Sequence, residues 1–223
     1  DYFTTDAIKN PALYRWTGVY WKQASIDVLT DAVSRQLRDY LVALAMRKGE
    51  LQIGNTDKGE VAALSDEATA LNKAAKRALG SYTVVQGVVK FVMGRLRKDV
   101  ALDTVPHLFV FENAVFDLRK NARVPPSRED YCTISCGFDY EERDEARLLA
   151  LNNILAQIFP EQAERECYCI IMATCMYGEV LDNFILANGS GRNGKGMIHE
   201  LLMAMLGSYA YLAPSSILTE KKK

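Results

Sequence analysis

The pattern with the clearest chemistry is the glycine-rich loop Gly189-Ser190-Gly191-Arg192-Asn193-Gly194-Lys195-Gly196, which fits G-x-x-x-x-G-K. In such loops, glycines at positive φ let backbone N–H groups surround phosphate oxygens, and the following helix adds its positive dipole end. Lys195 supplies an ammonium for the β- and γ-phosphates and is the candidate catalytic residue. We expect the nucleotide to contact the loop and the residue after it. The candidate binding residues are Gly189, Ser190, Gly191, Arg192, Asn193, Gly194, Lys195, Gly196 and Met197.

The flanking sequence strengthens this weak motif. Residues 183–187 (NFILA) read as a short buried strand, and residues 195–206 read as an amphipathic helix. Strand, glycine loop and helix in this order are the context that a phosphate-binding loop requires. The alternative is a glycine-rich turn that binds no ligand. The residues expected on the apolar face of the helix are Met197, Ile198, Leu201, Leu202 and Met205.

Gly196 follows the lysine, where the simplest pattern has a serine or threonine hydroxyl that binds Mg²⁺. Mg²⁺ would therefore need a water or an acidic residue from elsewhere, and no metal ligand is assigned in this chain. Nucleotide binding is better supported than hydrolysis. We interpret His199 as helix surface or packing, and Arg192 as a solvated side chain rather than a contact to phosphate or a neighbouring subunit.

The elements before the loop are mostly helical. Tyr14–Trp21 predicts a hairpin around Thr17-Gly18. Leucines and valines at helical spacing predict a helix from Ser25 to Met46, stopped near Gly49. A polar loop, 52–59, precedes a helix from Ser65 or Asp66 to Leu79. The next helix, 83–96, is expected to bury Val84, Val88, Phe91 and Val92.

A small β region follows. Residues 108–111 and 114–118 predict two strands joined at Glu112-Asn113, and residues 131–135 predict a third. Helices are then expected from Asp144 to Ile158 and from Gln162 to Met176. The fold class is mixed α/β, with a mainly helical N-terminal domain at 1–142 and the start of a P-loop domain at 143–223.

Composition is that of an ordinary globular protein: 49% of residues are hydrophobic, 25% are charged, and the net charge is -1. Five cysteines at irregular spacing form neither a disulfide framework nor a zinc site, so we interpret them as buried thiols in a reducing cytoplasm. No signal peptide or membrane-spanning run is recognised. The start at Asp1 and the end soon after the loop helix suggest a fragment.

Other residues with chemical potential favour structural roles. Trp16, Tyr20 and Trp21 are interpreted as a small core rather than a base-stacking surface. Asp117 and Asp139 lack an acid or histidine partner and are interpreted as turn residues. A group of cations is interpreted as a solvated face rather than a DNA path. These cations are Lys73, Lys76, Arg77, Arg95, Arg97 and Lys98.

The glycine loop, with asparagine before Gly-Lys, resembles the Walker A loop of superfamily 3 helicases, closest to the poxvirus-type and phage or plasmid primase–helicase group. Leu206-Gly207-Ser208-Tyr209 and Met176–Leu181 resemble segments of the same group. Phe111–Leu118, with Pro125 and Tyr131–Tyr140, resembles the end of the domain that precedes the helicase.

The resemblance implies an AAA+ type ATPase that uses ATP and Mg²⁺ in viral, phage or plasmid DNA replication. It implies a homo-hexameric ring on single- or double-stranded DNA, a preceding collar domain, and often a primase module. Two alternatives remain: a non-catalytic oligomerisation module with an incidental P-loop, or another P-loop NTPase such as a kinase. The long N-terminal region argues against a kinase, whose P-loop commonly lies near the start of its domain.

Overall fold

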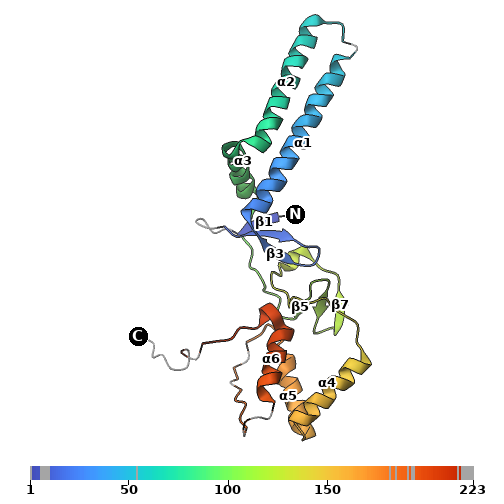
Figure 1. Cartoon of the computed structure of the whole chain (residues 1–223), viewed down its shortest axis with the longest axis vertical. Helices are drawn as coiled ribbons and strands as arrows, with labels where there is room; N and C mark the ends of the chain where they lie inside the picture. The colour runs from blue at the N-terminus through green and yellow to red at the C-terminus, as the bar shows by residue number, and fades with distance from the viewer. Residues whose placement is uncertain are drawn as a thin grey trace. The chain divides into compact units, whose positions relative to one another are not determined.

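The computed structural model describes residues 2–5, 11–53, 55–180, 182–183, 185–189, 191, 194–214 and 216, with only the backbone at position 79. The described residues form a mixed α/β structure in which helices predominate (Figure 1). Contacts divide the chain into unit 1, residues 1–15 and 23–100, and unit 2, residues 16–22 and 101–223. The mixed, mainly helical class is confirmed, whereas the domain boundary predicted at residue 142 stays a prediction.

A four-stranded sheet has the order β3-β2-β1-β4. Its strands are β1 (Tyr2–Thr5), β2 (Leu13–Trp16), β3 (Trp21–Ala24) and β4 (Arg97–Lys98). The predicted hairpin is confirmed as β2 and β3, and the Thr17 hydroxyl in its turn donates to the Tyr20 carbonyl at 3.0 Å. The sequence analysis missed β1 and the two-residue β4, which pairs with β1 in parallel.

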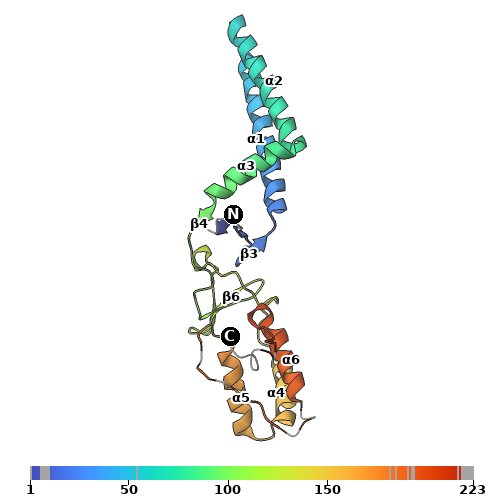
Figure 2. The same ribbon diagram turned by 90° about the vertical axis from the view of Figure 1, so that its left-hand side faces the viewer.

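Unit 1 contains the helices α1 (Ile26–Gln52), α2 (Lys58–Gly80) and α3 (Tyr82–Arg95). Figure 1 shows α1 and α2 side by side as a long antiparallel pair, and Figure 2 shows α3 crossing them at an angle. Leu13, Leu29, Val85 and Val89 form the buried core of this unit. This core joins the sheet to α1 and α3.

The helix boundaries partly follow the predicted signals. Ser25, where the helix was predicted to start, is the N-cap of α1, and its side chain accepts from the Asp27 N–H at 3.2 Å. The predicted stop near Gly49 is wrong, because α1 continues through this glycine to Gln52. A glycine costs a helix only about 1 kcal/mol, and packing against α2 outweighs that cost. The start of α2 was placed too late, because the Asp57 cap was missed.

The buried face of α3 differs from the predicted one. Val85 and Val89 are buried, whereas Val84 is 42% exposed and Phe91 is 64% exposed. The sequence has valine pairs at 84–85 and 88–89, so two apolar stripes, one residue apart, have equal helical periodicity. Contact with Leu13 and Leu29 selects the second stripe. Val84 and Phe91 of the first stripe therefore face outward from the core of this unit, whereas Val88 and Val92 are half-buried.

Unit 2 contains an antiparallel sheet of β5 (Leu108–Val110), β6 (Val115–Asp117) and β7 (Ala122–Val124). The first two strands confirm the prediction, and β7 was missed. The predicted third strand at 131–135 is wrong: Tyr131 adopts φ 46°. The segment is held by single backbone bonds, such as the Trp21 N–H to the Cys132 carbonyl at 2.8 Å, and by side-chain hydrogen bonds, rather than by a strand ladder.

Three helices follow in unit 2: α4 (Glu145–Ile158), α5 (Gln162–Thr174) and α6 (Lys195–Leu206). Figure 2 shows them together below the small sheet. The 3₁₀ helices η1 (Arg128–Asp130) and η2 (Gly207–Tyr209) complete the unit. All three predicted helices are confirmed, and Asp144 caps α4 by accepting from the Ala146 N–H at 2.8 Å.

The strand predicted at 183–187 is wrong for the residues described, since positions 183 and 185–187 have no regular structure. Leu186 is 78% exposed. A strand requires a hydrogen-bonded neighbour, and no described segment pairs with this one. The apolar run does precede the glycine loop, but no described strand lies beside it to pair with it.

The cysteines were only partly predicted. Cys132 and Cys136 are buried, whereas Cys167, Cys169 and Cys175 are exposed, which corrects the expectation of five buried thiols. Burial raises the pKa of the Cys132 thiol to about 12, so this thiol is not a nucleophile at neutral pH. Among the described residues, no helix is long and apolar enough to cross a bilayer.

Candidate functional site

The N-terminus of α6 has the backbone geometry expected of a phosphate site. Gly194, its N-cap, has φ 81° and ψ −2°, and Gly191 has φ 80°. No side chain caps the helix, and its first turn has no acidic residue. The first-turn N–H groups of Gly196 and Met197 therefore have no capping side chain of the kind that usually accepts from such groups. Such a terminus favours an anion.

Gly194 is also constrained by packing. A Cβ at this position would lie 2.9 Å from two side-chain atoms of Ile158, at the end of α4. The positive φ and this close approach together require glycine. Ser190, Arg192 and Asn193 lie outside the described residues, so their predicted contacts stay predictions.

A cavity of about 500 Å³ lies beside Lys195. This volume is within the range of small-ligand pockets. Its walls come from α5, from the segment before the glycine loop and from α6. The lining residues are Phe159, Ala163, Glu164, Cys167, Tyr168, Ile171, Ile185, Leu186, Ala187, Asn188, Lys195, Ile198 and His199.

The contribution of α5 to this cavity was not predicted from the sequence, which indicated only a helix from Gln162 to Met176. Among the described residues, the Tyr168 hydroxyl is buried without a hydrogen-bond partner, and burial raises its pKa. The ring of Tyr168 packs on Phe159, with centroids 4.8 Å apart. Burying a hydroxyl without a hydrogen-bond partner costs folding free energy. The helical periodicity of the sequence does not indicate that the Tyr168 hydroxyl is such a group.

Only part of the apolar face predicted for α6 is buried. Ile198 is buried, whereas Met197, Leu201 and Met205 are among the exposed large hydrophobic residues. His199 is exposed at the rim of the cavity, consistent with its interpretation as helix surface. Met197 remains a candidate through its backbone N–H rather than its side chain.

The other end of α6 is fixed to the small sheet. Gly207 follows the helix with φ 52° and ψ −121°, and a Cβ there would lie 2.0 Å from the Cys136 carbonyl oxygen. The Tyr209 hydroxyl accepts from the Val110 N–H at 3.1 Å and donates to the Ile134 carbonyl at 3.0 Å. Leu206, Phe109 and Cys136 form the core at this junction. The helix that begins at the glycine loop is thus anchored on β5.

A carboxylate links the hairpin turn to the sheet within unit 2. The Tyr20 hydroxyl donates to both oxygens of Glu112, at 2.9 and 3.1 Å, and the Ser135 hydroxyl donates to Oε1. The hydrogen bond from Ser135 is the main cause of the lowered pKa of Glu112, and the bond from Tyr20 acts in the same direction against burial. The ionised form is therefore the one that the fold stabilises.

We expect Glu112→Gln to lower the free energy of unfolding by about 1–2 kcal/mol at pH 7, because hydrogen bonds to a charged group weaken. A lowered folded pKa contributes stability above the ordinary value of 4.5, and this contribution is lost as the pH falls through the folded pKa. Urea denaturation at pH 7 and at pH 4 measures the difference in unfolding free energy between the parent chain and Glu112→Gln. This difference should be smaller at pH 4. Glu50→Gln, on exposed helix surface, is the control. A difference independent of pH would contradict the ionic origin.

The remaining candidates have structural roles. Tyr20 and Trp21 are buried, and the Trp21 ring packs against Trp16 with centroids 5.3 Å apart, which confirms the core interpretation. Asp117 is buried and accepts from the N–H groups of Arg119 and Lys120, so it is a turn residue as expected.

Comparison with known proteins gives one family match and several relatives. The family model described as "D5 N terminal like" matches residues 2–164. A protein of Acanthamoeba polyphaga mimivirus, named as a "Putative helicase", is 32% identical over 124 residues, which are 54% of this chain and 13% of the relative. A protein of Invertebrate iridescent virus 3 with the same description is 29% identical over 54% of this chain and 13% of the relative.

A third relative, the primase D5 of Fowlpox virus, is 27% identical over 137 residues, which are 56% of this chain and 17% of the relative. The matched regions thus span less than a fifth of the length of these curated relatives. The family match ends before the glycine loop. The assignment of that loop therefore depends on its own sequence and geometry.

Proposed function

Because this chain belongs to the D5 N terminal like family, the N-terminal region of poxvirus-type primase–helicases, we propose that it joins this region to the start of an ATP-driven DNA helicase motor. The observation that carries the proposal is the glycine loop that enters the uncapped N-terminus of α6. Loop and helix lie C-terminal to the region that the family model matches, which ends at residue 164. This order is the one expected if a motor follows the family domain.

The residues present fit a nucleoside triphosphate. Backbone N–H groups of the loop and of the first turn of α6 would hold phosphate oxygens, and Lys195 would neutralise the β- and γ-phosphates. The cavity beside Lys195 offers the aromatic and apolar walls that a nucleoside requires, with Tyr168 and Glu164 as polar groups. ATP is therefore the proposed ligand.

Mg²⁺ would accompany ATP and neutralise charge on its phosphates. Gly196 offers no hydroxyl, so this chain's loop would hold the metal less directly than a loop with serine or threonine. Water or an acidic side chain from another part of the complete protein would complete the coordination. Hydrolysis is thus proposed for the complete protein, and nucleotide binding for this chain.

In the complete protein, we propose a homo-hexameric ring that encircles DNA and works beside a primase during viral replication. Support comes from the relatives named as helicases and as a primase. Unit 1, which contains none of the glycine loop, is suited to a collar or linker role. Family membership favours this proposal over a small-molecule kinase.

Titration of a fluorescent ATP analogue into the chain tests nucleotide binding. We expect saturable binding that ATP and ADP displace but AMP does not, because the loop and Lys195 contact phosphates beyond the first. Mg²⁺ should strengthen binding by less than about tenfold, since the loop lacks the metal-binding hydroxyl. Displacement by AMP as efficient as by ATP would show that the cavity, rather than the glycine loop, holds the analogue.

A further inference from the structure

Basic residues are concentrated in one part of unit 1. Between Glu67 and Asp99 the sequence contains seven lysines and arginines and no acidic residue, although the whole chain has a net charge of -1. All seven side chains are exposed on α2, α3 and β4. They are Lys73, Lys76, Arg77, Lys90, Arg95, Arg97 and Lys98. This segment therefore carries a local positive potential that the net charge conceals.

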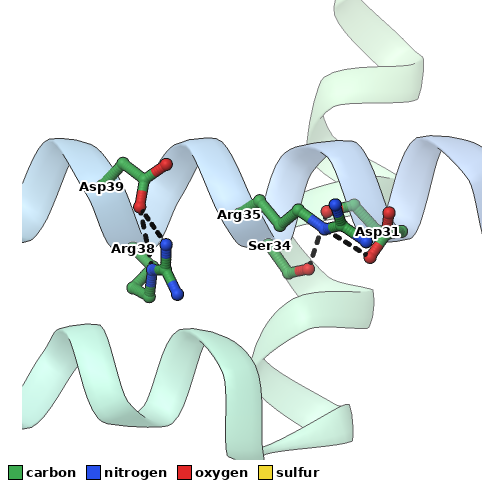
Figure 3. A network of polar contacts seen from close by, with 5 residues as sticks. All are labelled: Asp31, Ser34, Arg35, Arg38 and Asp39. Atoms are coloured by element: carbon green, nitrogen blue, oxygen red, sulfur yellow. Dashed lines mark hydrogen bonds and ion pairs between the residues drawn. The ribbon is translucent and has the colours of Figure 1, made fainter.

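Three cations elsewhere in the same unit form ion pairs, whereas Arg15, Arg47 and Lys58 form none among the described residues. Two pairs lie on α1 (Figure 3): the Arg35–Asp31 distance is 3.0 Å and the Arg38–Asp39 distance is 2.5 Å. Lys48 pairs with Glu67 at 2.6 Å between α1 and α2. In the described part of the chain, no ion pair is found for a second set of cations. This set is Lys73, Lys76, Arg77, Lys90 and Arg95.

The spacing of these residues places them on outer helix faces. Lys76 and Arg77 follow Lys73 by three and four residues, and all three share the side of α2 opposite the buried Ala75 and Ala78. On α3, the side opposite Val85 and Val89 carries Phe91 and Arg95. The Arg95 guanidinium lies 5.0 Å from the centroid of the Phe91 ring. One non-helical residue, Ser81, separates the two helices.

Exposed aromatic rings accompany the cations. Phe91 is 64% exposed, and Tyr82, at the start of α3, is 79% exposed. Positive charge alone fits any anionic surface, but cations interleaved with exposed rings are typical of single-strand binding, where bases stack on the rings and phosphates meet the cations. An acidic protein segment would use the charges and leave Phe91 without a matching group.

We propose that the outer faces of α2 and α3 form a binding surface for single-stranded DNA, separate from the glycine loop in unit 2. The phosphates contact Lys73, Lys76 and Arg77, and an unpaired base stacks on Phe91 beside Arg95. This surface goes beyond the proposed nucleotide site, because it needs neither ATP nor Lys195. Unit 1, which does not contain the glycine loop, contacts single-stranded DNA through this surface.

Fluorescence anisotropy of a labelled single-stranded DNA oligonucleotide, measured from 50 to 300 mM salt without nucleotide, tests the surface. Replacing Lys73, Lys76 and Arg77 by glutamine should weaken binding about 10- to 100-fold near 0.1 M salt and lower the slope of log K against log salt by about 2, because three phosphate contacts are lost. Phe91→Ala should weaken binding at least about fivefold with little change in this slope.

Matched controls separate this surface from general charge and from the glycine loop. Arg35→Gln with Arg38→Gln removes two ion-paired cations of the same unit and should change affinity less than about twofold. Phe91→Leu retains an apolar side chain and should behave like Phe91→Ala, since stacking is lost. Lys195→Ala should leave DNA binding unchanged even if ATP binding fails. All variants are first checked by circular dichroism.

Three results would overturn the proposal. The first is an unchanged salt slope in the triple variant, and the second is an equal loss in the Arg35 and Arg38 control. The third is duplex DNA, or a polyglutamate peptide of equal charge, binding as tightly as the single strand. Duplex or peptide binding would assign the surface to charge alone, because paired bases and glutamates cannot stack on Phe91.

Discussion

Lys195→Ala should lower the affinity of the chain for ATP about 10- to 100-fold, because a charged hydrogen bond to phosphate contributes about 1.5–3 kcal/mol. In the complete protein, the same change should reduce ATP turnover by about 100-fold or more, since this ammonium neutralises charge that develops in the transition state. Equilibrium titration measures the first effect, and steady-state phosphate release measures the second.

The fold should tolerate this change. Lys195 is the first residue of α6, where alanine is a good helix former. We therefore expect the denaturation midpoint of Lys195→Ala to remain close to that of the parent chain. Unchanged ATP turnover in the complete variant would remove Lys195 from the mechanism.

Lys195→Arg distinguishes charge from geometry. Arginine retains the positive charge but replaces the compact ammonium by a planar, wider group. Close contact of the loop backbone with phosphate leaves little room for a guanidinium, so we expect Lys195→Arg to lose most of its affinity for ATP as well. His199→Ala is a comparison variant on the same helix, because His199 is exposed and lines the same cavity four residues after Lys195. This variant should change the affinity for ATP several-fold at most.

Local signals in the sequence predicted the elements of this chain better than their packing. The predicted starts of two helices, at Ser25 and Asp144, coincide with the observed N-caps, and the glycine loop was recognisable by its spacing. The face of α3 was predicted wrongly, because the paired valines offer two equal stripes and only contact with Leu13 and Leu29 selects one. Such a choice is made by tertiary structure and is absent from the periodicity.

The candidate site was likewise predicted in its local elements but not in its packing. The loop, Lys195 and α6 follow from the sequence, because the chemistry of phosphate binding requires those residue types in that order. The cavity wall formed by Tyr168 and Glu164 does not, since these residues are distant in the sequence and have ordinary helical spacing. The strand expected at 183–187 failed because a strand depends on a neighbour that a single segment cannot specify.

The largest stability effect is expected at Gly207. We predict that Gly207→Ala lowers the free energy of unfolding by about 3 kcal/mol or more, from backbone strain and from a steric clash together. The backbone angles, φ 52° and ψ −121°, lie in a region that side chains other than glycine rarely enter. A Cβ would also lie 2.0 Å from a backbone oxygen, that of Cys136, which cannot rotate away.

Urea denaturation compares this variant with Gly49→Ala. Gly49 lies inside α1, and nothing lies within 4 Å of a Cβ built there. Alanine at position 49 should therefore stabilise the chain by about 0.4–1 kcal/mol, through helix propensity and a less flexible unfolded chain. If both variants changed stability by the same small amount, the close contact between Gly207 and Cys136 would not exist in solution.

The consequence of Gly207→Ala should extend to the nucleotide site. The helix α6 begins at the glycine loop and ends where Leu206 and the Tyr209 hydroxyl contact the β5 region. Displacing Gly207 from Cys136 would move the C-terminal end of α6 and, because a helix is stiff, also its first turn. We therefore expect weaker ATP binding by Gly207→Ala even at temperatures where the chain remains folded. Tyr209→Phe, which removes only the bridging hydroxyl, should have a smaller effect in the same direction.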